Sequence, residues 1–182
     1  MTTSITKRKT EKVCVLGILT ALFVALSMCL RVPIFDNFYV CLGYIAMYMA
    51  MALYGISGGL VVGTLGTAIY CLLISGLRGL PGWLIGNVAI SIILGLWMLM
   101  TRDLQHNWKW GTATIAIVII ATAVGMLIFK PITEVILYAQ PMWARIITNF
   151  PAFITDTIVL CGSIPLYKIL EPNIPKTVKT EA

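Results

Sequence analysis

Long apolar segments recur along almost the whole chain, and they limit its fold more than any other feature. Each of the six longest has roughly 18–22 residues, enough for an α-helix to cross a hydrocarbon core about 30 Å thick. We predict membrane-spanning helices over residues 13–30, 38–55, 57–75, 82–100, 111–129 and 146–167. The sequence lacks the segments of alternating polarity that are typical of membrane β-barrels. The predicted fold class is therefore an all-α integral membrane protein, a bundle of six transmembrane helices.

The composition agrees with a protein that is surrounded largely by lipid. Of the 182 residues, 59% are hydrophobic and 11% are charged, and the mean hydropathy is +0.95. A soluble domain is about 45–50% apolar and about 25% charged, so a chain of this size could not hide so much apolar surface from water. The length suits one transmembrane domain over residues 1–182.

The basic residues predict how the bundle is oriented. With the N-terminus inside, nine of the 13 lysines and arginines fall in the cytoplasmic tails and the loop at 101–110, and four fall outside. Such an excess in short cytoplasmic segments is the usual pattern of membrane proteins. We therefore predict that both termini are cytoplasmic. Because the basic residues flank the spans and do not gather on a folded polar surface, nucleic-acid binding is not expected.

The sequence gives little support to catalysis. Its only histidine, His106, lies in a polar loop. The string GISG at 55–58 matches the G-x-S-G of rhomboid-type membrane proteases, but no predicted span carries a histidine to serve as the base. There is no G-x-x-x-x-G-K-[ST] nucleotide-binding motif, and the five cysteines include no C-x-x-C pair. We predict no catalytic residue, no metal site, no cofactor and no enzymatic activity.

Polar side chains inside the predicted spans are candidates for function, because burying them in lipid is costly. Asp156 lies in the last span, where its carboxyl group could bind a ligand, relay a proton or hydrogen-bond to a polar residue of another helix. Asn87 lies near the start of the fourth span and Asn149 near the start of the sixth. Since an amide offers both donors and an acceptor, each asparagine could contact a polar ligand or could pack between helices.

Aromatic residues gather at the predicted outer ends of the helices. They are Tyr39, Tyr44, Trp83, Tyr138 and Trp143. They could form the aromatic belt of a membrane interface or a wall on which a ring-bearing ligand stacks. We expect the charged residues of the connection before the last span, Lys130, Glu134 and Arg145, to be solvated.

The segment GLRGLPGWLIGN at 76–87 places an arginine among glycines in an outer loop. The glycines give the backbone freedom, and Pro81 favours the start of a helix. We predict that Arg78 closes this loop over a bound ligand. The connections at 31–40 and 130–145 are also long and partly apolar, which favours a protein that holds something on its outer side.

Small residues at four-residue spacing predict close contacts between helices. Gly82 and Gly86 form such a face at the start of the fourth span. Gly17, Ala21 and Ala25 form another on the first span. The spacing leaves open whether this second face packs inside the bundle or docks a partner.

Together these features resemble the S components of energy-coupling factor (ECF) transporters, the small substrate-binding membrane subunits for vitamin uptake in prokaryotes. The resemblance covers roughly residues 11–170. It rests on the size, the six spans with both ends inside, the A-x-x-x-A face from Ala21 to Ala25, the run GYIAMYMAMALYGISGGLVVGTLG and the segment LPGWLIGN.

The resemblance implies a multi-pass protein of the prokaryotic plasma membrane that binds a vitamin in the outer half of the bundle. The candidate substrate-binding residues are Arg78, Trp83, Asn87, Tyr39, Trp143, Asn149 and the deeper Asp156. The face of Gly17, Ala21 and Ala25 would dock on the transmembrane scaffold subunit, the T component, and two ATPase subunits would supply the energy. Among the subfamilies the chain most resembles the cobalamin-specific one; pantothenate and folate are further candidates, because an outer arginine suits an anionic vitamin.

Two other functions remain open. A proton-coupled carrier working alone would use Asp156 as its relay, but the internal repeats common in such carriers are not evident between residues 1–90 and 91–182. A membrane scaffold subunit without a ligand would be favoured if Arg78, Trp83 and Asn87 faced lipid or a partner.

Overall fold

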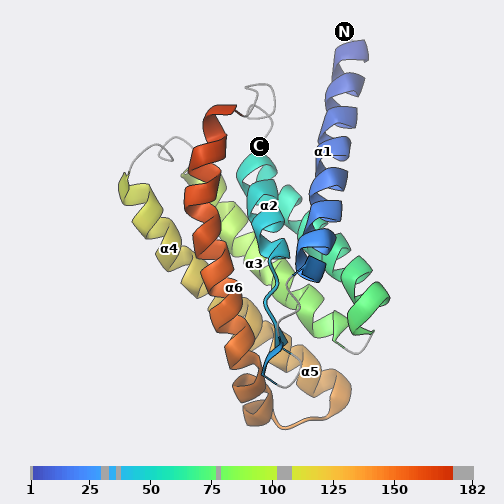
Figure 1. The fold of residues 1–182 in the computed structure, drawn as a ribbon, viewed down its shortest axis with the longest axis vertical. Helices are drawn as coiled ribbons and strands as arrows, with labels where there is room; N and C mark the ends of the chain where they lie inside the picture. Colours follow the sequence, from blue (N-terminus) through green and yellow to red (C-terminus); the bar gives the residue numbers. More distant parts are fainter. Residues whose placement is uncertain (1, 30–32, 36–37, 77–78, 102–107, 174–182) are drawn as a thin grey trace.

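The structure, a computed structural model, describes residues 2–29, 33–35, 38–76, 79–101 and 108–173. Its helices are α1 (Thr2–Cys29), α2 (Gly43–Tyr70), α3 (Leu80–Met100), α4 (Trp108–Ala123), α5 (Lys130–Tyr138) and α6 (Met142–Leu170). Two π-helical segments, Cys71–Ser75 and Val124–Phe129, extend α2 and join α4 to α5, and a short 3-10 turn, Glu171–Asn173, follows α6. The helices lie lengthwise beside one another as a bundle (Figure 1).

A short hairpin interrupts the otherwise helical chain between α1 and α2. Strands β1 (Pro33–Phe35) and β2 (Phe38–Tyr39) are antiparallel, with Pro33 opposite Tyr39. Because residues 38–39 pair in this hairpin, α2 begins at Gly43 and not at residue 38 as the hydropathy predicts.

Among the described residues, five helical segments are long and apolar enough to cross a membrane. They are Lys9–Cys29, Gly43–Ile74, Leu80–Met100, Lys109–Tyr138 and Met142–Leu170. The all-α membrane class is therefore confirmed apart from the hairpin. The count differs from the predicted six, because the second and third predicted spans are joined in one element, α2.

A sharp bend at Gly55 divides α2 into two arms. Gly55 has φ 62° and ψ −143°, outside the helical region, and a glycine adopts such a conformation without steric cost. An ideal Cβ added at Gly59 would lie 2.5 Å from Met51 Cγ, and one added at Gly63 would lie 3.0 Å from Met47 Sδ. Met51 and Met47 therefore pack against these two glycines. Since these pairs are placed symmetrically about Gly55, the arms fold back on each other as an antiparallel hairpin. The first arm, residues 43–54, is roughly 18 Å long, which is short for a full crossing.

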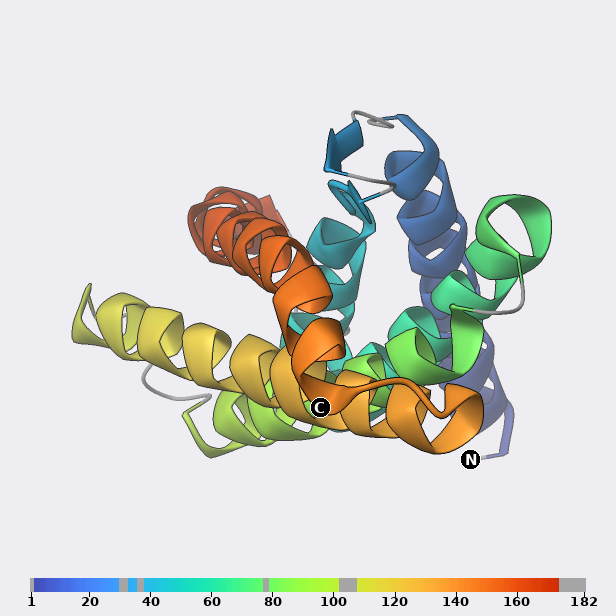
Figure 2. The same ribbon diagram turned by 90° about the horizontal axis from the view of Figure 1, so that it is seen from below.

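The bundle has two distinct ends, which we call the Lys12 end and the α5 end. At the Lys12 end, the Lys12 Nζ donates to Ser57 Oγ at 3.3 Å, and the Trp110 indole donates to Thr101 Oγ1 at 2.7 Å. The α5 end carries α5 and the first turns of α3 and α6. Figure 1 has the start of α1 at the top and α5 at the bottom. Seen from the α5 end, α5 lies against α3 (Figure 2).

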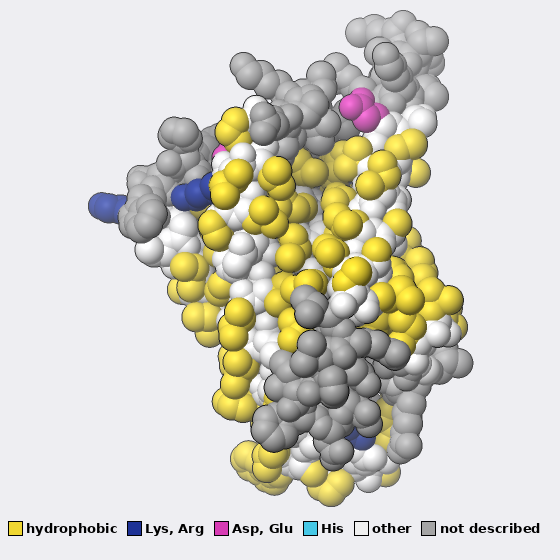
Figure 3. Space-filling view, in the orientation of Figure 1, with side chains coloured by type: hydrophobic (Ala, Val, Ile, Leu, Met, Phe, Trp, Pro, Cys, Tyr) yellow, Lys and Arg dark blue, Asp and Glu magenta, His cyan; other side chains and the backbone are white. Residues whose placement is uncertain are grey.

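Apolar side chains fill the interior and also cover the outside. Phe23, Met47 and Met51 are fully buried, while isoleucines such as Ile136 and Ile147 are at least 70% exposed. In Figure 3 hydrophobic side chains cover most of the described surface of this face, and the visible charges lie toward its upper and lower ends. A helical bundle whose interior and outer surface are both apolar is suited to a lipid bilayer and not to water.

Candidate functional site

The hydroxyl group of Tyr44 is the centre of a buried hydrogen-bond network at the α5 end. Tyr44, in the first turn of α2, donates to Asn87 Oδ1 at 2.7 Å and accepts from Trp83 Nε1 at 2.9 Å. Asn87, on α3, also donates to the carbonyl of Gly63 at 3.2 Å and to Thr67 Oγ1 at 2.7 Å. The amide therefore uses both of its N–H groups and its oxygen within the protein.

Trp83 has both a polar and an aromatic role in this network. Its indole N–H is bonded to Tyr44, and its ring meets Tyr70 edge-on, with centroids 5.5 Å apart and planes at 82°. The side chain is partly buried. It thus joins α3 to both arms of α2 and keeps part of its surface accessible.

Glu134 is the centre of a second group of polar side chains, contributed by α5 and α6. Its carboxylate accepts from Asn149 Nδ2 at 3.2 Å and forms an ion pair with Arg145 at 3.6 Å. Glu134 is 6% exposed and Asn149 2%, while the Arg145 side chain keeps 26%. The sequence-based expectation that Glu134 is solvated is therefore wrong: α5 turns it into the bundle.

Glycines on α3 allow α5 to approach closely enough to bury these charges. A Cβ added at Gly82 would lie 3.0 Å from Glu134 Cγ and 3.3 Å from Lys130 Cγ. One turn later, a Cβ at Gly86 would lie 3.1 Å from the carbonyl oxygen of Gly125. The predicted role of this glycine pair in close helix packing is confirmed.

Asp156 and Lys130 connect the two groups. Asp156 is 4% exposed; its carboxyl interacts with the Lys130 ammonium and the Tyr44 hydroxyl. The Lys130 ammonium is in turn attracted by the Glu134 carboxylate and repelled by the Arg145 guanidinium. We call the resulting set the polar cluster, and its members are Tyr44, Trp83, Asn87, Lys130, Glu134, Arg145, Asn149 and Asp156.

The structure brings four of the seven candidate substrate-binding residues into the polar cluster: Trp83, Asn87, Asn149 and Asp156. Trp143 is 76% exposed and takes no part in the contacts described above. Tyr39 pairs in β2 through its backbone. Arg78 lies outside the described residues.

Lys130, Glu134 and Arg145 are cluster members that the sequence analysis expected to be solvated, and Tyr44 was named there only as one of the outer aromatic residues. Glu134 and Lys130 lie four residues apart on one turn of helix, downstream of an apolar span. This i,i+4 spacing places both side chains on one face of the helix. It is the feature of the sequence from which their common direction could have been predicted.

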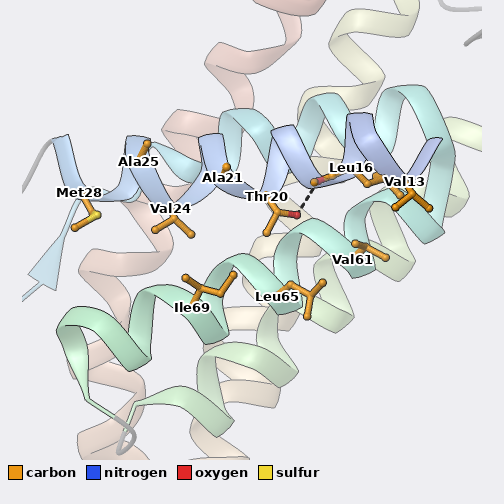
Figure 4. Close-up of a pocket in the computed structure, with 11 residues that line it drawn as sticks. Val13, Leu16, Thr20, Ala21, Val24, Ala25, Met28, Val61, Leu65 and Ile69 are labelled. Carbon is orange, nitrogen blue, oxygen red and sulfur yellow. Dashed lines mark hydrogen bonds between the residues drawn. The ribbon is translucent and has the colours of Figure 1, made fainter. Parts of the chain in front are cut away.

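A groove on the other side of the bundle contains all three residues of the predicted docking face. It has a volume of about 730 Å³ and lies between α1 and the second arm of α2 (Figure 4). Gly17, Ala21 and Ala25 are exposed along it, and Val61 and Leu65 form the opposite wall. We call this feature the α1 groove.

The surface of the α1 groove is almost entirely apolar. Its one hydroxyl group among the lining residues belongs to Thr20 and donates to the carbonyl of Leu16 in the same helix at 2.8 Å. A Cβ added at Gly17 would meet nothing within 4 Å. The small residues therefore leave a hollow that is not filled by the described part of the chain.

A family model described as ECF-type riboflavin transporter, S component, matches residues 7–172. The match includes both the polar cluster and the α1 groove. It names a riboflavin-type family and gives no support to cobalamin. No curated protein and no solved structure matches the chain.

Proposed function

This chain belongs to the family of ECF-type riboflavin transporter S components, and from that premise we propose that it captures riboflavin at the α5 end of the bundle. Members of the family are substrate-binding subunits of transporters and not enzymes. The protein is accordingly a multi-pass protein of the plasma membrane. The observation that carries the proposal is the polar cluster, which gathers side chains of α2, α3, α5 and α6 at one end of the bundle.

The charges of the polar cluster favour a neutral ligand. Lys130 and Arg145 are balanced by Glu134 and Asp156, and these groups interact with one another. A net-neutral site offers donors and acceptors but no uncompensated cation for a carboxylate or phosphate. Riboflavin is neutral and presents a flat ring with donors and acceptors on its edge, which suits amides and aromatic edges.

The arrangement also indicates where such a ring enters. Trp83 keeps part of its surface accessible while its N–H is fixed by Tyr44, and it lies at the first turn of α3, next to the predicted loop of Arg78. We propose that the ring packs against Trp83 and that its polar edge forms hydrogen bonds with Asn149 and Glu134. Arg78 would cover the ligand from the loop.

Calorimetry with the purified chain in detergent tests this proposal directly. The titrants are riboflavin, cobalamin, pantothenate and folate. We expect riboflavin to bind and the two anionic vitamins and cobalamin to bind at least 100-fold more weakly, since a buried polar group left unpaired costs about 1–3 kcal/mol and several would be left so. Tight binding of cobalamin with none of riboflavin would refute the assignment.

A pair of variants makes the test specific for the site. Glu134→Gln should weaken riboflavin binding by about tenfold, because a charge-assisted hydrogen bond is worth more than a neutral one. Thr148→Ala, on the same helix as Asn149 but bonded only to its own turn, should bind as the unchanged protein does. If folded protein binds no vitamin of the panel, a scaffold subunit or a proton-coupled carrier becomes the better explanation.

The family also implies partners, the T component and two ATPases. We propose the α1 groove as the surface that receives the T component. A helix can approach closely where the lining is Gly17, Ala21 and Ala25, because small residues let backbones come together. The apolar lining and the absence of a filling side chain among the described residues support this choice.

A further inference from the structure

A second hollow lies between α4 and α6, toward the Lys12 end and away from the polar cluster. Gly111, Thr112 and Ile115 form its α4 wall, and its volume is about 180 Å³. Thr112 is exposed and Ile115 is 41% exposed, so the hollow opens toward the surroundings of the bundle. We call it the α4–α6 groove.

The α6 wall is a single stripe of the helix. Cys161, Ile164, Pro165 and Lys168 line it, at the spacing of one helical face. From Cys161 to Lys168 the wall runs roughly 10 Å along the axis. The α6 wall of the groove is thus apolar along most of its length and carries one cationic side chain, Lys168, at its end.

Contacts with α4 hold Lys168 in position at this end of the groove. Its Nζ lies over the ring of Trp110, 5.8 Å from the centroid, and Trp110 is itself 4% exposed and bonded to Thr101. A Cβ added at Gly111 would lie 3.5 Å from Nζ, an ordinary van der Waals contact, so the ammonium group lies directly beside the start of α4. A cation–π contact uses the charge of the ammonium but none of its three N–H donors.

We propose that the α4–α6 groove binds one anionic phospholipid, with an acyl chain along the apolar walls and the phosphate on Lys168. Both walls belong to segments long and apolar enough to cross the membrane. A lysine at the end of such a segment reaches the level of the headgroups. With the predicted orientation, this end faces the cytoplasmic leaflet, whose anionic lipids attract lysines. The inference does not depend on which vitamin the protein binds.

Native mass spectrometry of the full chain, with phosphatidylglycerol and phosphatidylcholine of identical acyl chains, tests the inference. We expect the unchanged protein to retain phosphatidylglycerol about fivefold more strongly, the effect expected of one lysine near the headgroups. Lys168→Gln should abolish this preference. Lys12→Gln is the matched control: Lys12 also lies over an aromatic ring, Tyr54 at 5.2 Å, at the same end of the bundle but outside this groove, and its loss should leave the preference intact.

A second variant tests the acyl-chain part of the inference. Thr112→Phe places a ring in the groove at an exposed position without changing the charge, and it should reduce retention of both lipids. Thermal unfolding of each variant verifies that it is folded. Equal retention of the two lipids by the unchanged protein, equal loss of preference in Lys12→Gln, or displacement of the lipid by inorganic phosphate alone would each overturn the proposal.

Discussion

In the polar cluster the side chains pair with one another, whereas in the α1 groove the small residues border a hollow that the described part of the chain does not fill. Asn87 uses its whole amide on Tyr44, Thr67 and the backbone. Gly17, by contrast, has open space beside it. A region whose side chains pair with one another contributes to folding in addition to the ligand binding proposed for it, and an unfilled apolar hollow is available to a partner protein. Substitutions should therefore reduce stability in the first region and assembly in the second.

The largest effect is expected where two backbones touch beneath the polar cluster. A Cβ added at Gly125 would lie 2.7 Å from the carbonyl oxygen of Gly86 and 2.7 Å from Ile90 Cγ1. Gly125→Ala must therefore separate α3 from the segment before α5, and we expect it to lower the free energy of unfolding by about 3 kcal/mol. Unfolding by sodium dodecyl sulfate, followed by circular dichroism, measures the change.

The control for this substitution is Gly162→Ala on α6. An added Cβ there would meet nothing within 4 Å, and alanine is the better helix former by about 1 kcal/mol. We expect unchanged or slightly higher stability. Equal losses at Gly125 and Gly162 would contradict the close approach of the two backbones.

The next effect concerns the ion pair of the polar cluster. Glu134→Ala leaves Asn149 and Arg145 without their shared acceptor, and we expect a loss of about 2–3 kcal/mol, less than for a fully buried pair because Arg145 keeps 26% exposure. Glu134→Gln keeps an acceptor for Asn149 and should lose less. The same unfolding measurement compares the two, and a larger loss in Glu134→Gln would argue against the ion pair.

A smaller effect distinguishes two tyrosines one turn apart on α2. Tyr44→Phe removes the partner of both Asn87 and Trp83, and we expect a loss of about 1–2 kcal/mol. The hydroxyl of Tyr48 is buried and has no hydrogen-bond partner among the residues that the structure describes, so Tyr48→Phe should cost nothing or stabilise the protein. Equal losses measured for the two variants would mean that the network around Tyr44 contributes little.

Much of the fold was predictable because lipid requires long apolar helices. The positions of α3 and α6 follow closely from hydropathy, and so does the apolar part of α1, although that helix begins eleven residues before the predicted span, at Thr2. The start of α2 did not, since residues 38–42, FYVCL, which include strand β2, are as apolar as the helix that follows them. The bend at Gly55 falls where the predicted spans 38–55 and 57–75 meet, but the merging of these two spans in one element depends on a single backbone conformation.

The site was predictable only where the membrane makes a polar residue costly. This reasoning found Asn87, Asn149 and Asp156, all of which are buried. It missed Glu134, because an acidic residue in a connecting segment resembles any solvated charge. Its burial depends on Gly82 of another helix, a tertiary contact that no local pattern reveals. The exposure of Trp143 likewise depends on how α6 lies in the bundle.

The smallest effect on stability, and the largest on assembly, is expected in the α1 groove. Ala25 is exposed and lines the groove, so Ala25→Leu should change the free energy of unfolding by no more than about 0.5 kcal/mol. The added side chain nevertheless fills the hollow where a partner helix would approach, and capture of the T component in a pull-down should fall by about tenfold or more. Ile18→Leu, at a residue that is 67% exposed and outside the groove, should leave both quantities unchanged. If Ala25→Leu unfolded the protein or left capture intact, the groove would be a packing surface of this chain, and the contrast with the polar cluster would not hold.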